Sequence, residues 1–275
     1  MQKLDCKAVR DFKLALHKEE IKKLGVQPKL TIIQVGDRAD SNRYVANKAK
    51  RAEECGIEVK IVKLAKDVPQ QILNIVVSSE QWSCDSIIVQ CPLPKHINEK
   101  EVLGFINPMQ DCDGLTKENI GYLHYQEPRI TPATAQGILD LLDYYKVDVT
   151  GMDILLIGRS NLVNRPLYEA LTQRNATCTL AHSKTKNLQQ KLESGYDMVI
   201  GAIGQDRFLK NVDAKYIIDV GINVDENDKL HGDFDIDTCS CEYYTPVPSG
   251  VGLLTQEAIV GNIVKCFKLL HNKID

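Results

Sequence analysis

Residues 153–166, DILLIGRSNLVNRP, carry the clearest structural pattern in the chain. The first five, Asp153–Ile157, are mostly apolar and predict a buried strand. Gly158 follows at once, and Pro166 predicts a helix that runs to about Arg174, because proline is accepted in the first turn of a helix. A strand, a glycine turn and a helix in this order are typical of a unit that binds a phosphate group at the turn.

Three further apolar runs follow in the second half of the chain, at residues 177–181, 197–201 and 216–220. Each is short enough to be a strand, and the segments between them can hold crossover connections. Because parallel strands need such crossovers, this half predicts a Rossmann-like, doubly wound parallel sheet.

The first half shows the same alternation of helix and strand patterns. The predicted helices are 3–24, 41–55 (with Ser41 as N-cap) and 69–79, and the predicted strands are 29–35, 58–64 and 86–90. Strands separated by helices favour a parallel sheet covered on both faces. The predicted fold class is therefore α/β in both halves.

The stretch 117–134 contains glycine and proline and little apolar periodicity, so we place the domain boundary there. Residues 1–119 are expected to form the first domain and residues 120–254 the second, which would open with a helix at about 134–145. The last helix, at about 255–275, is expected to return and pack on the first domain.

Composition excludes several classes of protein. The chain has 275 residues, 43% of them hydrophobic, which is enough for two modest domains, and a net charge of −3. The absence of a basic excess argues against nucleic-acid binding. No apolar run approaches the ~18 residues of a membrane span, and the charged start MQKLDCKAVRDFK lacks the apolar core of a signal peptide. We therefore expect a soluble cytoplasmic protein.

The cysteines and histidines do not predict a metal site. There are nine cysteines and no C-x-x-C pair, and the single residue between Cys239 and Cys241 is poor spacing for zinc. The cysteines are expected to be reduced and mostly buried. His96, His124 and His182 show no ligand spacing and are assigned no role.

The turn at residues 158–160 is the first candidate binding site, because its backbone N–H groups and the following helix can hold phosphate. The next strand ends before Ser183 and Lys184. An acidic residue there would favour NAD, whereas these residues, with Arg159, suit the extra phosphate of NADP. The alternatives are an ordinary strand–helix turn and solvated loop charges.

Tyr44 and Lys48 form a second candidate, because residues four apart share one face of a helix. A lysine can exchange protons near neutral pH if burial or another cation disfavours its charge. The alternative is an exposed lysine beside a core tyrosine. Short-chain dehydrogenases also contain Tyr-x-x-x-Lys, but there it follows the nucleotide-binding unit, whereas here it precedes that unit.

Three loops complete the candidate site. Gln90 ends an apolar strand, where ligands of parallel sheets bind. Asp111 and Asp113 lie in the loop NPMQDCDGLT, and a carboxylate can accept hydrogen bonds from the N–H groups of a ligand. Residues 245–252, TPVPSGVG, form a stiff bend that a ligand can approach closely. The alternatives are turn-forming aspartates and a plain connecting turn.

Taken together, seven segments resemble the bifunctional methylenetetrahydrofolate dehydrogenase / methenyltetrahydrofolate cyclohydrolase family. They run in family order from Val35 to Gly252: VGDRADSNRYVANKAK, IIVQCPLPKHIN, INPMQDCDGL, LLIGRSNLVNRP, AHSKTKNL, IIDVGIN and TPVPSGVG. The resemblance implies two α/β domains flanking a cleft, a homodimer joined through the nucleotide-binding domains, and a role in the one-carbon metabolism that serves purine, methionine and histidine biosynthesis.

The resemblance also implies roles for individual residues. On the folate side, Tyr44 would stack on the folate, Lys48 would orient the substrate and activate water, Gln90 would hydrogen-bond Lys48 and tune its protonation, and Asp113 would anchor the pterin. Substrate contacts would also come from Pro248 and Gly250. The NADP site would be lined by Gly158, Arg159, Ser160, Ser183 and Ile222.

The chain departs from the family pattern in several loops. Ala133 and Ala135 stand where cysteine and proline are usual, Ser249 and Asn164 where glycine is common, Leu253 where proline is expected, and Thr116 where histidine often occurs. None of these changes removes a predicted catalytic group. They bear on loop geometry, on folate affinity and on the balance of the two activities.

The predicted function has two steps. NADP-dependent oxidation of 5,10-methylenetetrahydrofolate would give the methenyl cation, and water would then convert that cation to 10-formyltetrahydrofolate without a metal. Three alternatives stay open: a dehydrogenase of the same build acting on a small acid, a folate- or nucleotide-binding protein without activity, and a methyltransferase that binds S-adenosylmethionine.

Overall fold

The computed structural model describes residues 1–272, with the side chain of Asp40 left out. The chain forms two compact units. Residues Met1–Asp11 and Thr134–Thr255 make up the six-stranded unit, and Phe12–Ala133 with the chain from Gln256 onward make up the three-stranded unit.

The boundary between the units differs from the one expected near residue 119. The chain is divided between Ala133 and Thr134, because Ile130 and Ala133 are buried in the core of the three-stranded unit. The first eleven residues join the other unit, since β1 (Gln2–Lys3) pairs with β11 (Tyr243–Tyr244).

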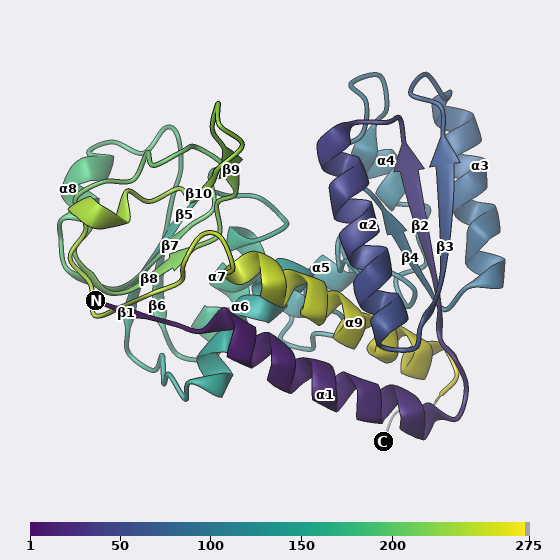
Figure 1. The fold of residues 1–275 in the computed structure, drawn as a ribbon, viewed down its shortest axis with the longest axis horizontal. Coiled ribbons are helices and arrows are strands. Elements are labelled where there is room, and N and C mark those ends of the chain that lie inside the picture. Colours follow the sequence, from purple (N-terminus) through teal and green to yellow (C-terminus); the bar gives the residue numbers. More distant parts are fainter. Residues whose placement is uncertain (273–275) are drawn as a thin grey trace. The chain divides into compact units, whose positions relative to one another are not determined.

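The three-stranded unit is a parallel sheet of order β3-β2-β4. Its elements are β2 (Lys29–Val35), α2 (Ala39–Glu54), β3 (Glu58–Leu64), α3 (Gln70–Glu80), β4 (Ser86–Val89), α4 (Glu99–Leu103) and α5 (Lys117–His124), with most of α1 (Cys6–Leu24) and α9 (Val251–Leu270). Helices α2 and α3 lie on opposite sides of the sheet (Figure 1). The central strand β2 is buried from Leu30 to Val35, which explains its nearly continuous apolar sequence.

The six-stranded unit has the strand order β1-β11-β8-β7-β5-β6, and every neighbouring pair is parallel. Its main elements are α6 (Ala133–Tyr144), β5 (Asp153–Ile157), α7 (Asn164–Gln173), β6 (Thr177–Ala181), α8 (Leu188–Leu192), β7 (Tyr196–Gly201) and β8 (Ala214–Asp219). A separate antiparallel hairpin joins β9 (Asn223–Val224) to β10 (Leu230–His231). The α/β class and the doubly wound parallel sheet are confirmed.

Several local predictions need correction. Ser41 is not an N-cap, because α2 begins at Ala39 and Arg38 takes the cap position. Helix α9 begins at Val251, so the predicted loop 245–252 ends inside its first turn. The short helices α4, α5 and α8 were missed, since each has eight residues or fewer and too little periodicity to detect.

All nine cysteines are free, and five of them are buried, as expected. Within residues 1–272, no helix is both long and apolar enough to cross a membrane.

Candidate functional site

Both sheets reverse their strand order at a defined point. In the three-stranded unit the chain passes from β2 to β3 on one side and returns to β4 on the other. In the six-stranded unit β5 lies between β6 and β7 in the same way. Ligands of open parallel sheets bind at the carboxyl ends of the strands beside such a switch point, and the predicted site residues follow these strands.

Lys48 and Asp113 form the central charged pair of the three-stranded unit. Lys48 Nζ lies 3.3 Å from Asp113 Oδ2, and the two side chains are only 13% and 18% exposed. Tyr44, one turn earlier on α2, remains 43% exposed. The structure thus brings together a partly buried ammonium and carboxylate, with an accessible aromatic ring on the same helix face.

Asp111 has a different structural role from Asp113, although the sequence analysis named both as candidate site residues. Asp111 is buried, and its carboxylate accepts hydrogen bonds from the backbone N–H groups of Gly114 (2.9 Å) and Thr116 (2.7 Å) and from Asn119 Nδ2 (3.0 Å). Burial raises the pKa of this carboxyl group. Asp111 therefore shapes the loop that presents Asp113.

A second support for this loop comes from α9. Asn262 is buried, and its Nδ2 donates to the carbonyl oxygens of Cys112 (3.0 Å) and Thr131 (2.8 Å). At Gly114 the backbone has φ +72°, and a Cβ there would lie 2.8 Å from the nitrogen of Pro132. The loop can pass so close to residues 131–132 only because this position is glycine.

Gln90 lies directly after β4 and is buried. Its Nε2 donates to the carbonyl oxygen of Cys91 at 2.7 Å. Its Oε1 is also buried, and it has no hydrogen-bond partner among the described residues. The structure therefore does not contain the hydrogen bond between Gln90 and Lys48 that the resemblance implied. An unsatisfied buried acceptor is costly, so this oxygen is the part of Gln90 that a ligand can use.

Cys91 is a neighbour of the site that the sequence interpretation did not single out. Burial raises the pKa of its thiol; the charges of Glu99 and Asp113 raise it further, and that of Lys48 lowers it. The sequence feature that could have identified Cys91 was its position directly after Gln90, at the end of a strand. The protonated thiol contributes bulk rather than charge beside Lys48 and Asp113.

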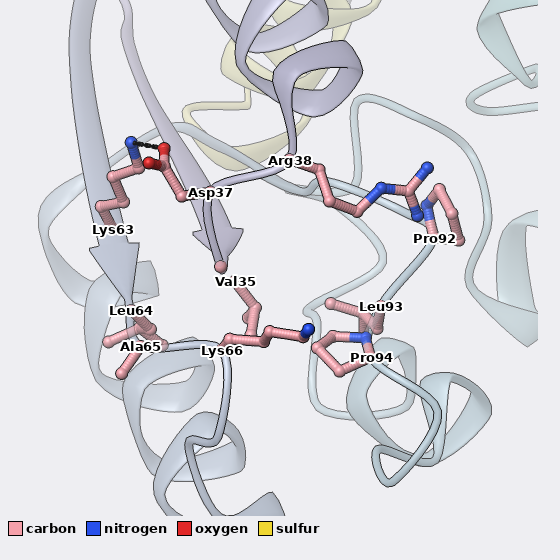
Figure 2. Close-up of a pocket in the computed structure, with 11 residues that line it drawn as sticks. Val35, Asp37, Arg38, Lys63, Leu64, Ala65, Lys66, Pro92, Leu93 and Pro94 are labelled. Atoms are coloured by element: carbon pink, nitrogen blue, oxygen red, sulfur yellow. Dashed lines mark hydrogen bonds and ion pairs between the residues drawn. The ribbon is translucent and has the colours of Figure 1, made fainter.

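A cavity of about 690 Å³ opens at the carboxyl edge of the same sheet. It is lined by Val35, Gly36, Asp37, Arg38, Lys63, Leu64, Ala65, Lys66, Pro92, Leu93 and Pro94. Lys63 pairs with Asp37 at 2.6 Å. The side chains of Arg38 and Lys66 extend toward the Pro92–Pro94 loop (Figure 2). The cavity therefore has a cationic rim next to the loop that follows Gln90.

In the six-stranded unit, Gly158 follows β5 at the switch point. Its φ is +116°, and a Cβ would lie only 2.5 Å from the carbonyl oxygen of Ala202, which follows β7. Only glycine fits here. The turn can therefore pack closely against the ends of β5 and β7 and expose its backbone to a ligand.

Asn164 is the first residue of α7 and explains one departure from the family pattern. It is buried, and its Nδ2 donates to the carbonyl oxygens of Ile157 (2.7 Å) and Gly158 (3.4 Å). Its Oδ1 is buried and has no hydrogen-bond partner among the described residues. Asparagine thus ties the turn to the helix with a side chain that glycine lacks.

The remaining predicted cofactor residues lie on loops at the same sheet edge. Arg159 and Ser160 are exposed on the turn after β5, and Ser183 and Lys184 are exposed after β6. Ile222, after β8, is 43% exposed. These residues form no ion pair with any described side chain, which leaves Arg159 and Lys184 available to a phosphate group.

The loop before α9 lies next to Ile222. A Cβ on Gly252 would lie 3.2 Å from Ile222 Cδ1. Gly250 has no room for a side chain, because its Cβ would lie 2.1 Å from the carbonyl oxygen of Pro246. Pro248 is exposed, and Ser249 has φ +72°.

Two family models together match most of the chain. Residues 4–113 match the catalytic domain of tetrahydrofolate dehydrogenase/cyclohydrolase, and residues 132–271 match its NAD(P)-binding domain. The chain belongs to the tetrahydrofolate dehydrogenase/cyclohydrolase family. The resemblance carried by the seven sequence segments is confirmed.

Relatives in this family agree over nearly full length. Bifunctional protein FolD of Lactococcus lactis subsp. cremoris (strain MG1363) is 40% identical over 90% of this chain and 89% of its own. The crystal structure of the bifunctional FolD enzyme from Campylobacter jejuni covers 100% of both chains, with 35% identity and a TM-score of 0.93. The Trypanosoma brucei enzyme, in complex with NADP and an inhibitor, covers 97% of both chains with 33% identity and a TM-score of 0.91.

Proposed function

We propose that this family member oxidises 5,10-methylenetetrahydrofolate with NADP and hydrolyses the resulting 5,10-methenyltetrahydrofolate to 10-formyltetrahydrofolate. The observation that carries this proposal is the partly buried Lys48–Asp113 pair, in the same unit as Gln90, whose buried Oε1 lacks a partner among the described residues. A dehydrogenase for a small acid would have no need of a pterin anchor such as Asp113. A methyltransferase would have no need of an NAD(P)-binding domain.

The six-stranded unit fits NADP. The Gly158 turn gives a ligand access to backbone N–H groups, and the buried Oδ1 of Asn164 lacks a partner among the described residues. No acidic residue occupies positions 182–186 after β6; Ser183 and Lys184 stand there instead. We therefore assign Gly158, Arg159, Ser160, Ser183 and Ile222 to the cofactor. When bound, NADP accepts the hydride from the bridging methylene group.

The three-stranded unit supplies the folate side. Tyr44 offers an exposed ring against which the folate can stack. Asp113 can accept hydrogen bonds from pterin N–H groups, since an ionised carboxylate is an acceptor only. Arg38 and Lys66, on the rim of the cavity in Figure 2, suit the glutamyl carboxylates of the substrate. Pro248 and Gly250 complete the proposed substrate contacts.

Lys48 takes the main part in the hydrolytic step. When the pterin occupies Asp113 and Lys48 has given up a proton to solvent, its neutral amine can accept a proton from the water that attacks the methenyl carbon. That proton can then pass to the ring nitrogen as its bond to the methenyl carbon breaks, while the second proton of the water goes to solvent and the formyl group stays on the other nitrogen. Gln90 Oε1 can accept a hydrogen bond from Lys48 and hold the amine toward the substrate. The methenyl cation is already electrophilic, so positioning the water is the chief requirement.

We also propose that the enzyme works in the cytoplasm as a homodimer joined through its six-stranded units. This proposal rests on the family resemblance. Light scattering coupled to gel filtration tests it, and a monomer at micromolar concentration would contradict it.

The activity is tested by following cofactor reduction after 5,10-methylenetetrahydrofolate is added with NADP or with NAD. We expect folate-dependent reduction, faster with NADP, and formation of 10-formyltetrahydrofolate by the wild type. Absence of reduction with both cofactors would contradict the proposed dehydrogenase.

A further inference from the structure

Two buried carboxylates lie in the six-stranded unit outside the residues assigned above. Asp219 ends β8 and is 6% exposed, and Asp233 follows β10 and is fully buried. Neither forms an ion pair with a described residue. Buried polar oxygens need hydrogen-bond partners, and here N–H donors supply them.

Asp233 gathers donors from two loops. Its Oδ2 accepts from the backbone N–H groups of Ile203 (2.6 Å) and Gly204 (3.2 Å). Its Oδ1 accepts from the N–H of Gln205 (2.8 Å) and from Asn223 Nδ2 (3.1 Å). One carboxylate thus fixes the segment after β7 and the segment after β8.

Asp219 holds the other end of this arrangement. Its Oδ1 accepts from the N–H groups of Gly221 (3.0 Å) and Asp233 (2.9 Å), and its Oδ2 accepts from that of Phe234 (3.2 Å). Ile222 therefore lies between a residue bound to Asp219 and a residue bound to Asp233, so its backbone is held on both sides.

The backbone packs tightly against both carboxyl groups at two glycines. A Cβ on Gly221 would lie 2.3 Å from Asp233 Oδ1, and a Cβ on Gly232 would lie 1.7 Å from Asp219 Oδ2. The two glycines allow the backbone to close around both carboxylates.

The two fixed segments border the cofactor turn. Gly158 packs against the carbonyl oxygen of Ala202, the residue before Ile203. The ends of β5, β7 and β8 therefore meet at one place, where an extended ligand crossing the sheet edge contacts all three. Asp233 sets the geometry of two of these three ends.

We propose that Asp233, supported by Asp219, is a positioning residue for NADP, which holds Ile222 and residues 203–205 in the shape that receives the cofactor. This inference rests on the proposed function, because it takes NADP as the ligand. The alternative, a general structural role, predicts equal loss of both activities.

The test uses Asp233→Asn, measured beside wild type. Each oxygen of Asp233 accepts two hydrogen bonds. Asparagine replaces one of these oxygens by an NH2 group, which cannot accept and would face two N–H donors. Asp225→Asn is the matched control, because Asp225 lies on the nearby β9–β10 hairpin and, within residues 1–272, accepts bonds only from that hairpin.

Three quantities are measured: the Kd for NADP by calorimetry without folate, the KM for NADP against kcat, and the hydrolysis of methenyltetrahydrofolate. In Asp233→Asn we expect Kd and KM to rise ~10-fold or more, the size of losing one charge-assisted hydrogen bond. We expect kcat at saturating NADP and the hydrolysis rate to stay within about 2-fold, and Asp225→Asn to match wild type.

If Asp233→Asn does not fold, Asn223→Ala tests the same idea, because it removes one of the four bonds to Asp233; a rise of about 3-fold in Kd is expected. Unchanged Kd in a folded variant, or a parallel loss of hydrolysis, would overturn the proposal. Wild type that binds NADP without reducing it would contradict the proposed function, while the Kd comparison would still decide the inference.

Discussion

The two units share an architecture but place different kinds of groups at their switch points. The three-stranded unit sets titratable side chains there, with Lys48 and Asp113 in a partly buried pair 3.3 Å apart. The six-stranded unit sets backbone there, at Gly158, where no side chain fits. A fold provides the edge, and the residues placed on it decide whether the edge performs proton chemistry or holds an anionic cofactor.

This difference predicts that the two activities can be separated by substitution. A change at the charged pair should damage hydrolysis, and a change at the glycine turn should damage use of the cofactor.

Lys48→Gln should reduce cyclohydrolase activity by about 10²–10⁴-fold, the usual contribution of a general acid–base group. Glutamine keeps a hydrogen bond to Asp113 but cannot carry a proton. The rate of methenyltetrahydrofolate hydrolysis measures the effect. Lys50→Gln, an exposed change on the same helix, is the control, and equal losses in both variants would contradict the role of Lys48.

Gly158→Ala should raise the KM for NADP by ~10-fold or more, because the new Cβ collides with the carbonyl oxygen of Ala202 and displaces the turn. Steady-state kinetics with varied NADP measures the change. Gly151→Ala also has a positive φ, of +73°, but open space around its Cβ. It should lower stability without altering the KM for NADP; equal KM changes would contradict the packing argument.

Asp219→Asn should alter how stability depends on pH. Burial raises the pKa of Asp219 to about 7, whereas the unfolded chain has the ordinary value near 4. Between these values the folded state binds one proton more, so this group makes the free energy of unfolding fall as pH rises from about 4 to 7, by up to ~1.4 kcal/mol per unit.

Urea unfolding at pH 5, 6, 7 and 8 checks this sign. Relative to Asp219→Asn, wild type should lose stability from pH 5 to 7 and change little from 7 to 8. Asp225→Asn is the control, because the hydrogen bond from His231 lowers the pKa of Asp225 to about 2. A wild-type advantage that grows with pH would show that the sign is wrong.

Ser249→Gly should give the smallest effect. Ser249 has φ +72° in a loop where the family usually has glycine, and a non-glycine residue in this conformation costs about 1 kcal/mol. The greater freedom of glycine in the unfolded chain offsets part of that. We expect the free energy of unfolding to rise by about 0.5 kcal/mol; a decrease in urea unfolding would contradict the strain argument.

Much of the fold could be predicted from the sequence. The bounds of β2 and β5 were predicted correctly because both strands are buried and nearly continuous in apolar residues. Helices α4 and α5 were missed because each is held mainly by caps, Asn98 and Thr116, rather than by a long apolar stripe.

The site was only partly predictable. Sequence position pointed to Lys48, Gln90 and Gly158 because each follows a strand or lies one helical turn from another candidate, and to Asp113 because it lies with Asp111 in the loop NPMQDCDGLT. It could not separate Asp111 from Asp113, which differ only in burial and in their donors. The Asp219–Asp233 network joins segments 14 residues apart, and no local sequence pattern predicts such a contact.

The most direct test that the two steps depend on separate sets of residues is to mix two variants, Lys48→Gln and Gly158→Ala. Lys48→Gln should stop at methenyltetrahydrofolate, and Gly158→Ala, at low NADP, should hydrolyse methenyltetrahydrofolate but scarcely form it. The initial rate of 10-formyltetrahydrofolate formation from methylenetetrahydrofolate and NADP is measured for each variant and for an equal mixture. We predict that the rate of the mixture exceeds the sum of the rates of the two variants alone, because the methenyl product of one is hydrolysed by the other. A mixture no faster than that sum would contradict the assignment of the two steps to two separate sets of residues.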